Sequence, residues 1–182
     1  MNSTALQNPS DPDATYRNKA GKLHRGYVAN LEETVDKNGS VVTDYQYDKN
    51  IHTDSQFLQE SLSQMDRSEE EIVLITDGGY AGQCRPKIDG WNATFITSKN
   101  ASNRAKSQRY MQSEEFSNYA KLRNGVETVP ANIRKNYRLD KLPRGKQRGK
   151  FFFGSKIAAL NFRKLFGFRK GLVNYAQNPI FG

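Results

Sequence analysis

Apolar and polar residues alternate along two neighbouring stretches near the start of the chain. Residues 26–35 and 41–47 each show the period of two that is typical of a strand with one buried face. An Asn-Gly pair lies between them, and tight hairpin turns favour that pair. We therefore expect an antiparallel hairpin. Residues 1–24 are polar and rich in Pro, Asp and Asn, so we expect a lead-in that is disordered or orders only on contact.

A helix and a short strand are expected after the hairpin. Thr53 and Gln56 have the spacing of a capping box, and apolar residues then recur at helical intervals, which predicts a helix over residues 54–66. Residues 72–75 are apolar and mostly β-branched, as in a buried strand, and Asp77 follows with two glycines. Because open α/β sheets bind ligands at the carboxyl ends of their strands, Asp77 is a candidate site residue. The simpler alternative is an ordinary Asp-Gly turn.

The second half of the chain has mainly helical patterns. Residues 93–98 are a short strand candidate, whereas residues 101–123 contain many helix formers and no strand signal. We expect one long helix that continues through Glu127 and breaks near Pro130. Residues 151–168 place apolar side chains on a wide helical face, which predicts a terminal amphipathic helix. The order of elements is that of a mixed α/β fold.

Charge is unevenly distributed along the 182 residues. The formal net charge is +9, but residues 1–100 carry 10 basic and 15 acidic residues, and residues 101–182 carry 18 and 4. A half this basic is typical of a protein that binds a polyanion, with nucleic acid as the first candidate and a merely soluble basic surface as the alternative. Residues 134–150 are expected to form a basic linker that contacts the DNA backbone through Arg144, Lys146, Arg148 and Lys150.

Several classes of protein are excluded by composition. Cys84 is the single cysteine, so neither a disulfide framework nor a cysteine-cluster zinc site can form. No apolar run approaches the roughly 20 residues needed to span a bilayer, and the N-terminus lacks the pattern of a signal peptide. We expect a cytoplasmic, nucleoid-associated protein with no membrane partner and a C-terminal tail over residues 169–182.

A second carboxylate, Glu127, lies among basic residues. On a continuous helix, Tyr119, Arg123, Glu127 and Arg134 would share roughly one face. A carboxylate flanked by two guanidinium groups and a phenol could hold a metal ion and bind phosphates on either side of it. The alternative is a surface helix with an Arg–Glu pair.

Six short motifs occur in the same order as in bacterial insertion-sequence transposases of the DDE class, which this chain resembles. They are SDPDATY (10–16), GYVA (26–29), DGGY (77–80), RNGVE (123–127), KFFFG (150–154) and KIAALNF (156–162). The resemblance covers nearly the whole chain, from Ser10 to Phe166.

The resemblance implies a ribonuclease H-like α/β core over residues 25–133, in which three acidic residues bind two divalent ions, Mg²⁺ or Mn²⁺. Asp77 matches the second Asp of the family and Glu127 matches its catalytic Glu, so both are expected to be catalytic and metal-binding. The residues expected to support them are Tyr119, Arg123, Arg134 and Lys135.

Two departures from the family pattern change the expected activity. The first Asp of the family, on a central strand upstream of the segment that matches Asp11 to Asp13, has no counterpart. The family's insertion after the Asp-Gly-Tyr motif is also absent, which leaves Cys84 as an isolated remnant. The resemblance therefore implies an N-terminally truncated and internally deleted copy, with an incomplete core that lacks the first central strand. The acids nearby, Asp11, Asp13, Asp36 and Asp44, are poor replacements.

We expect a transposase fragment that binds insertion-sequence ends and is weakly active or inactive in metal-dependent DNA strand cleavage and transfer. The alternatives are a non-catalytic DNA-binding decoy or regulator, and a chain with no stable fold. A second copy or a full-length transposase is the other expected partner.

Overall fold

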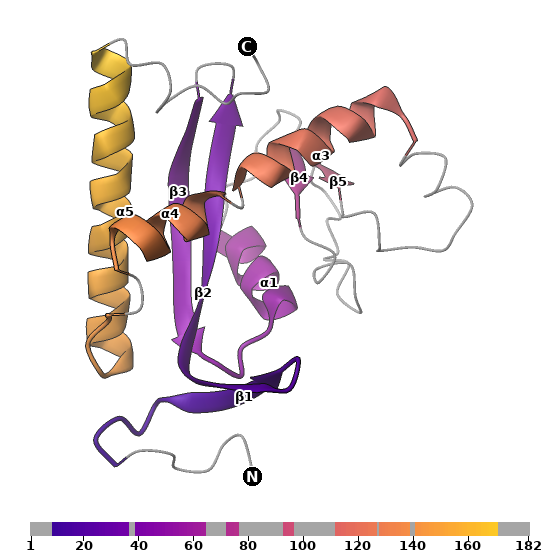
Figure 1. Cartoon of the computed structure of the whole chain (residues 1–182). Coiled ribbons are helices and arrows are strands. Elements are labelled where there is room, and N and C mark those ends of the chain that lie inside the picture. The colour runs from indigo at the N-terminus through magenta and orange to yellow at the C-terminus, as the bar shows by residue number, and fades with distance from the viewer. Residues whose placement is uncertain are drawn as a thin grey trace. The chain divides into compact units, whose positions relative to one another are not determined.

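The computed structural model describes residues 9–36, 39–64, 72–76, 93–96, 112–126, 128–138 and 141–170. These residues belong to two compact units. Figure 1 labels their helices and strands. The first unit combines the residues up to His52 with those from Thr128 onward, and the second comprises Thr53–Glu127.

A three-stranded antiparallel sheet is the centre of the first unit. Its strands are β1 (Thr15–Lys19), β2 (Lys22–Asp36) and β3 (Gly39–Lys49), in the order β1-β2-β3. The predicted hairpin is confirmed as β2 and β3, with Asp36 paired to Gly39 across the turn. Both strands are longer than their alternating stretches, because the pairing continues through more polar residues at the ends.

The expectation that residues 1–24 lack regular structure is wrong for β1 and the start of β2. Lys19 pairs with Lys22 across a two-residue turn, in which Ala20 and Gly21 have φ angles of 52° and 76°. Positive φ at both central positions gives the twist that a tight hairpin requires. β1 is an edge strand in which only Thr15 is buried, and it carries polar side chains and lacks an apolar strand pattern.

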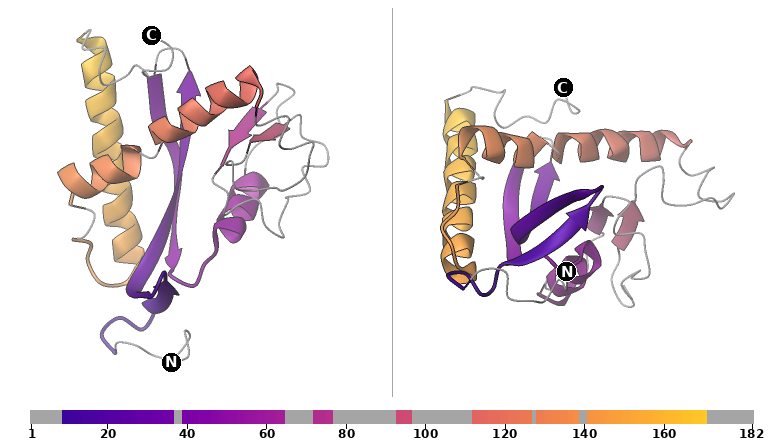
Figure 2. Two further views of the ribbon diagram at one scale, coloured as in Figure 1. Left: turned by 45° about the vertical axis from the view of Figure 1, so that its right-hand side comes forward. Right: turned by 60° about the horizontal axis from the view of Figure 1, so that its bottom comes forward.

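Two helices complete the first unit, α4 (Thr128–Asn136) and α5 (Lys146–Arg169). In each view α5 runs along the β2–β3 hairpin (Figure 2). The shared core consists of Val42, Tyr47, Val129, Ile133, Phe153, Ile157 and Leu160.

Glycines in α5 let the tyrosines of β3 lie close against the helix. A Cβ atom on Gly149 would come within 2.6 Å of the Tyr47 hydroxyl, and one on Gly154 would collide with the Tyr45 ring. Both tyrosines contact Phe153, at ring-centroid distances of 5.7 Å for Tyr45 and 5.8 Å for Tyr47.

The predicted terminal helix is confirmed as α5, but it begins earlier and buries less than expected. Residues 146–150, assigned to the basic linker, form its first turns, and residues 134–136 end α4. Arg, Lys and Gln are good helix formers, so a basic segment need not be a linker. Phe151 and Phe152 are exposed, because only the side of the helix that carries Phe153 faces the sheet.

The second unit contains α1 (Asp54–Gln64), β4 (Ile72–Ile75), β5 (Ala93–Ile96) and α3 (Glu114–Val126). The predicted capping box is confirmed: Gln56 N–H donates to Thr53 Oγ1 at 3.3 Å, and Thr53 N–H donates to Gln56 Oε1 at 2.9 Å. β4 and β5 pair in parallel, and α3 packs against β4. The mixed α/β class is confirmed.

The long helix expected through Glu127 is described as two helices. α3 begins after Ser113, whose Oγ accepts from the Phe116 N–H at 3.1 Å, and ends at Val126. α4 then starts at Thr128. Pro130 lies in the first turn of α4, where its missing N–H leaves no intrahelical bond unmade. No described helix is long and apolar enough to cross a membrane.

Candidate nucleic-acid interface

Exposed cationic side chains follow one another from the end of α4 into the first turns of α5. Arg134 and Lys135 occupy the last turn of α4, where positive charge is favoured by the partial negative charge at a helix C-terminus. The exposed members of this group, called here the basic segment, are Arg134, Lys135, Arg138, Lys141, Arg144, Arg148 and Lys150. All of them lie in the first unit.

Lys146, predicted to contact DNA, binds a protein carboxylate instead. Its Nζ donates to Asp48 Oδ2 at 2.7 Å, and the Lys49 N–H donates to Asp48 Oδ1 at 2.6 Å. Partial burial would raise the pKa of Asp48, but these two donors outweigh burial and hold the pKa below its ordinary value. Lys146 therefore ties the start of α5 to β3 and is not one of the exposed cations.

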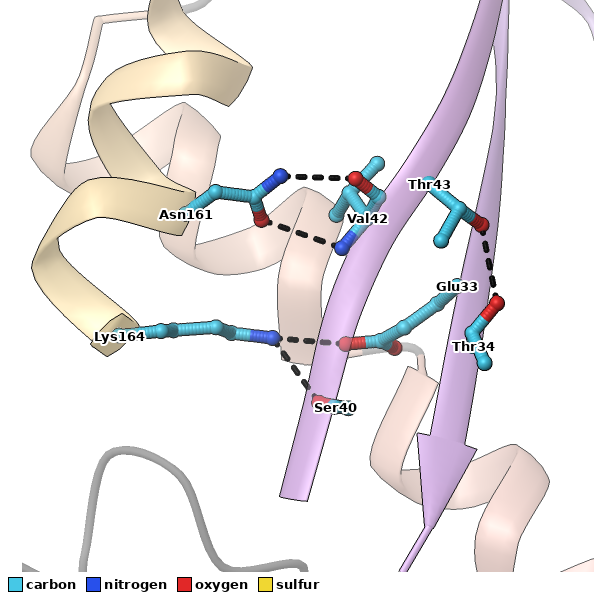
Figure 3. Close-up of polar contacts among 7 residues, drawn as sticks. All are labelled: Glu33, Thr34, Ser40, Val42, Thr43, Asn161 and Lys164. Carbon is cyan, nitrogen blue, oxygen red and sulfur yellow. Dashed lines mark hydrogen bonds and ion pairs between the residues drawn. The ribbon is translucent and has the colours of Figure 1, made fainter. Parts of the chain in front are cut away.

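Lys156 and Lys164 of α5 also bind protein groups. Lys156 Nζ donates to the carbonyl oxygens of Tyr137 and Arg138, close to the end of α4. Lys164 Nζ donates to Glu33 Oε1 at 2.8 Å and to Ser40 Oγ at 2.9 Å (Figure 3). The Glu33 side chain is only 3% exposed.

Asn161 binds the main chain of β3. Its Nδ2 donates to Val42 O at 2.7 Å, and its Oδ1 accepts from the Val42 N–H at 3.1 Å (Figure 3). Because β3 is at the edge of the three-stranded sheet, its outer main-chain groups have no neighbouring strand. The asparagine amide satisfies one donor and one acceptor there, so α5 is fixed to β3 by specific polar contacts as well as by its core residues.

Several described acids, including two of the possible replacements for a third catalytic carboxylate, have structural partners. Tyr27 donates to Asp11 Oδ1 at 2.5 Å, and Lys49 Nζ lies 3.1 Å from Asp13 Oδ1. Burial, together with the hydrogen bond to Asp11, raises the pKa of Tyr27, and burial raises the pKa of Tyr47 to about 12. Asp44 is exposed on β3. Within the described part of the chain, no three His, Cys, Asp or Glu side chains are placed to hold a metal ion.

The two predicted catalytic residues, Asp77 and Glu127, lie outside the described residues. The elements just before them are described: β4 ends two residues before Asp77, and α3 ends one residue before Glu127. Both elements belong to the second unit and pack against each other.

The residues expected to support the catalytic acids belong to two helices. Tyr119 is half-buried on α3, and Arg123 is on the same helix with its side chain outside the described part. Arg134 and Lys135 are on α4, in the first unit. The shared face predicted for this group assumed one continuous helix; Glu127, the residue between α3 and α4, lies outside the described residues, so the shared face stays a prediction.

The structural contacts of Asn161, Lys146, Lys156 and Lys164 were not predicted, although the sequence carries a signal for Lys164. Lys164 continues the spacing of Phe153, Ile157 and Leu160, which are the buried residues of α5. A lysine at the end of a buried stripe indicates a partner carboxylate, and Glu33 supplies it. Nothing in the sequence pattern distinguishes Asn161 from a surface residue.

In comparisons with known proteins, residues 2–162 match the family model described as Transposase DDE domain. No curated protein and no solved structure matches the chain. The mixed α/β arrangement with a three-stranded antiparallel sheet is consistent with the ribonuclease H-like core of such domains.

Proposed function

Because this chain belongs to the family of transposase DDE domains, whose function is DNA transposition, we propose that it binds DNA through the basic segment. The observation that carries this proposal is the exposure of cations along that segment, while the neighbouring Lys146 and Lys156 bind protein groups. The fold thus uses some of its basic residues internally and leaves a contiguous group of others at the surface.

Lysine and arginine side chains on a surface bind phosphates of the DNA backbone and release the counterions condensed there. Such contacts position a protein on DNA without reading its sequence. If six of the seven cations each contact a phosphate, the affinity falls by roughly 10³-fold between 50 and 200 mM salt. Recognition of insertion-sequence ends, a location at the nucleoid and association with a full-length transposase belong to the same proposal.

DNA binding can be tested by fluorescence anisotropy with a labelled duplex over a series of salt concentrations. In the test variant, Arg144→Gln, Arg148→Gln and Lys150→Gln remove three cations of the basic segment. We expect weaker binding and a salt slope that is smaller by about 2.7, or about 0.9 for each lost phosphate contact.

A matched control removes three exposed cations from β1 and β2 of the same unit, by Lys19→Gln, Lys22→Gln and Arg25→Gln. This control has the same net charge as the test variant. If both variants lose the same affinity, binding depends on overall charge and the proposed interface is wrong.

For catalysis, we propose that Asp77 and Glu127 are the second and third acids of the family site, with Arg123 beside Glu127. The family match includes both positions, and the packing of α3 against β4 supports their proximity. Carboxylate oxygens are the ligands that Mg²⁺ and Mn²⁺ prefer. When bound in such a site, the metal ions would activate the attacking oxygen and stabilise the leaving one.

Such a site needs a third carboxylate ligand besides Asp77 and Glu127. Among the described acids, Asp11, Asp13, Asp48 and Glu33 are each bound by a protein donor. We therefore propose that strand cleavage by this chain is weak or absent, and that it acts mainly as a DNA-binding decoy or regulator. A ribonuclease H-like core with a deletion after Asp77 is part of this proposal and rests on the resemblance of the motifs.

A nicking assay on supercoiled plasmid with Mg²⁺ or Mn²⁺ separates the two activities. We expect no metal-dependent nicking above that of the Asp77→Ala and Glu127→Ala variants, and unchanged DNA binding by both. Nicking by the unsubstituted chain that either substitution abolishes would instead establish catalysis and refute the decoy.

A further inference from the structure

Two exposed aromatic rings directly follow the basic segment. Phe151 and Phe152, in the second turn of α5, are 69% and 48% exposed. Their ring centroids are 5.8 Å apart and the rings are close to perpendicular, at 79°. Because exposed rings forgo the free energy that burial would provide, a pair of them usually marks a surface that binds a partner.

Exposed cations surround this pair of rings. Arg148 precedes Phe151 by three residues and Phe152 by four, so it lies on the same side of the helix, at roughly 5–6 Å between Cβ atoms. Lys150 adjoins Phe151, and Arg144 lies just ahead of the helix. Positive charge is unfavourable at a helix N-terminus, where the partial charge is also positive. The stability of α5 therefore does not explain these cations, whereas an anionic ligand does.

The chain around the rings carries charge of one sign. Residues 141–170 contain ten basic residues and no Asp or Glu. A partner that fits this surface must bring both negative charge and flat apolar area, and a nucleic acid has both in its phosphates and its base faces. In a duplex the base faces are covered by neighbouring base pairs, so a side chain reaches them only where a base is unstacked.

We propose that Phe151 and Phe152 stack on unpaired bases, so that the basic segment binds single-stranded DNA through its bases as well as its phosphates. This inference rests on the DNA binding proposed above and names the form of DNA. Arg144, Arg148 and Lys150 bind phosphates, and the neighbouring rings bind bases of the same strand. A base stacked on one ring meets the edge of the other, an arrangement that aromatic groups favour. Every base has a π face, so the contact reads no sequence.

A lipid surface or a protein could also bind exposed phenylalanines beside cations. Leucine is large and apolar and serves such partners about as well as phenylalanine. Only an aromatic ring has the π face that stacks on a base. Replacement of the two rings by leucine therefore separates base stacking from simple burial of apolar area.

Fluorescence anisotropy with a labelled strand of twelve thymidines, and with a labelled duplex of the same length, tests the inference. In the double variant Phe151→Leu, Phe152→Leu we expect the Kd for the single strand to rise about tenfold or more, because each base–aromatic stack contributes about that factor. The Kd for the duplex should be unchanged. The matched control Phe166→Leu, Phe168→Leu removes two other exposed rings of α5, ~21–24 Å further along the helix, and should change neither Kd.

Salt dependence distinguishes the rings from the cations. The rings hold no phosphate, so the leucine variant should keep the salt slope of single-strand binding. The variant Arg144→Gln, Arg148→Gln, Lys150→Gln should reduce that slope by about 2.1, or about 0.7 for each lost phosphate contact. A strand of the same length whose nucleotides are abasic keeps every phosphate, and it should bind the unsubstituted chain and the leucine variant equally weakly.

Several outcomes would overturn base stacking. They are an unchanged single-strand Kd in the leucine variant, equal weakening of single strand and duplex, and full affinity of the unsubstituted chain for the abasic strand. Anionic vesicles that bind the unsubstituted chain and the leucine variant alike, with single-strand binding unaffected by leucine, would assign the rings to a lipid surface. A chain that binds neither form of DNA refutes the proposed function and the inference together. Duplex binding through the basic segment without an effect of leucine on the single strand refutes the inference alone.

Discussion

Replacing Lys164 by methionine should strongly destabilise the first unit. Lys164 Nζ lies 2.8 Å from Glu33 Oε1, and the two side chains are 14% and 3% exposed. Removal of the cation leaves the Glu33 carboxylate buried without its charged partner, and breaking a buried ion pair in this way costs about 3 kcal/mol or more. Methionine keeps most of the aliphatic stem, so little of that loss comes from packing.

Replacing the acid of this pair should destabilise the fold less than replacing the lysine. After Glu33→Gln, the Lys164 ammonium keeps the Ser40 hydroxyl at 2.9 Å and is close enough to the surface to contact water. We expect a loss of about 1–2 kcal/mol, typical of one hydrogen bond to a charged group. The double variant should be more stable than Lys164→Met alone, because it has no uncompensated buried charge.

Urea unfolding followed by circular dichroism gives the three free energies of unfolding, and a double-mutant cycle gives the coupling between the two residues. Lys150→Met is the control, since Lys150 is an exposed lysine of the same helix and should change stability by less than about 0.5 kcal/mol. A Lys164→Met variant as stable as this control would show that the pair is not buried in solution, and the docking of α5 described above would be wrong.

Two further substitutions test other contacts of α5. Gly154→Ala should destabilise the chain by about 1–3 kcal/mol, because the new Cβ collides with the Tyr45 ring, and this outweighs the higher helix propensity of alanine. Ser155→Ala changes an exposed neighbouring residue and is the control, so it should have little effect in the same urea titration. The pKa of Asp48 is lower in the folded chain than its ordinary value of 3.8, so its ion pair stabilises the fold above that value and the stabilisation is lost as the pH falls through the folded pKa. The difference in melting temperature between the unsubstituted chain and Asp48→Asn should therefore shrink below about pH 4, and a constant difference would contradict the assignment.

Elements that carry their own periodic pattern could be predicted from the sequence. The β2–β3 hairpin alternates, α1 has a capping box, and α5 repeats apolar residues at helical spacing. β1 was missed because its stability comes from pairing with β2, and an edge strand needs no apolar face of its own. The boundary between α4 and α5 was misplaced because basic residues favour helices as much as linkers.

The candidate interface was predicted from the number of basic residues. That number does not show which of their side chains are exposed and which are bound to other protein groups. Arg144, Arg148 and Lys150 are exposed as expected, whereas Lys146 is held by Asp48. The partner of a lysine is set by tertiary contacts between residues about a hundred positions apart, and no local pattern contains that information. Asp77 and Glu127 came from motif resemblance and stay predictions.

The contact between Asn161 and Val42 joins residues that are 119 positions apart in the chain. At ~5–20 residues per second, a ribosome needs roughly 6–24 s to reach Asn161 after it has made Val42. During that interval the β2–β3 hairpin can form but its outer edge has no cover, and an uncovered edge strand readily pairs with other chains. Yield during expression should therefore depend on how fast α5 is synthesised and docks, so slow codons between the hairpin and α5 should favour aggregation.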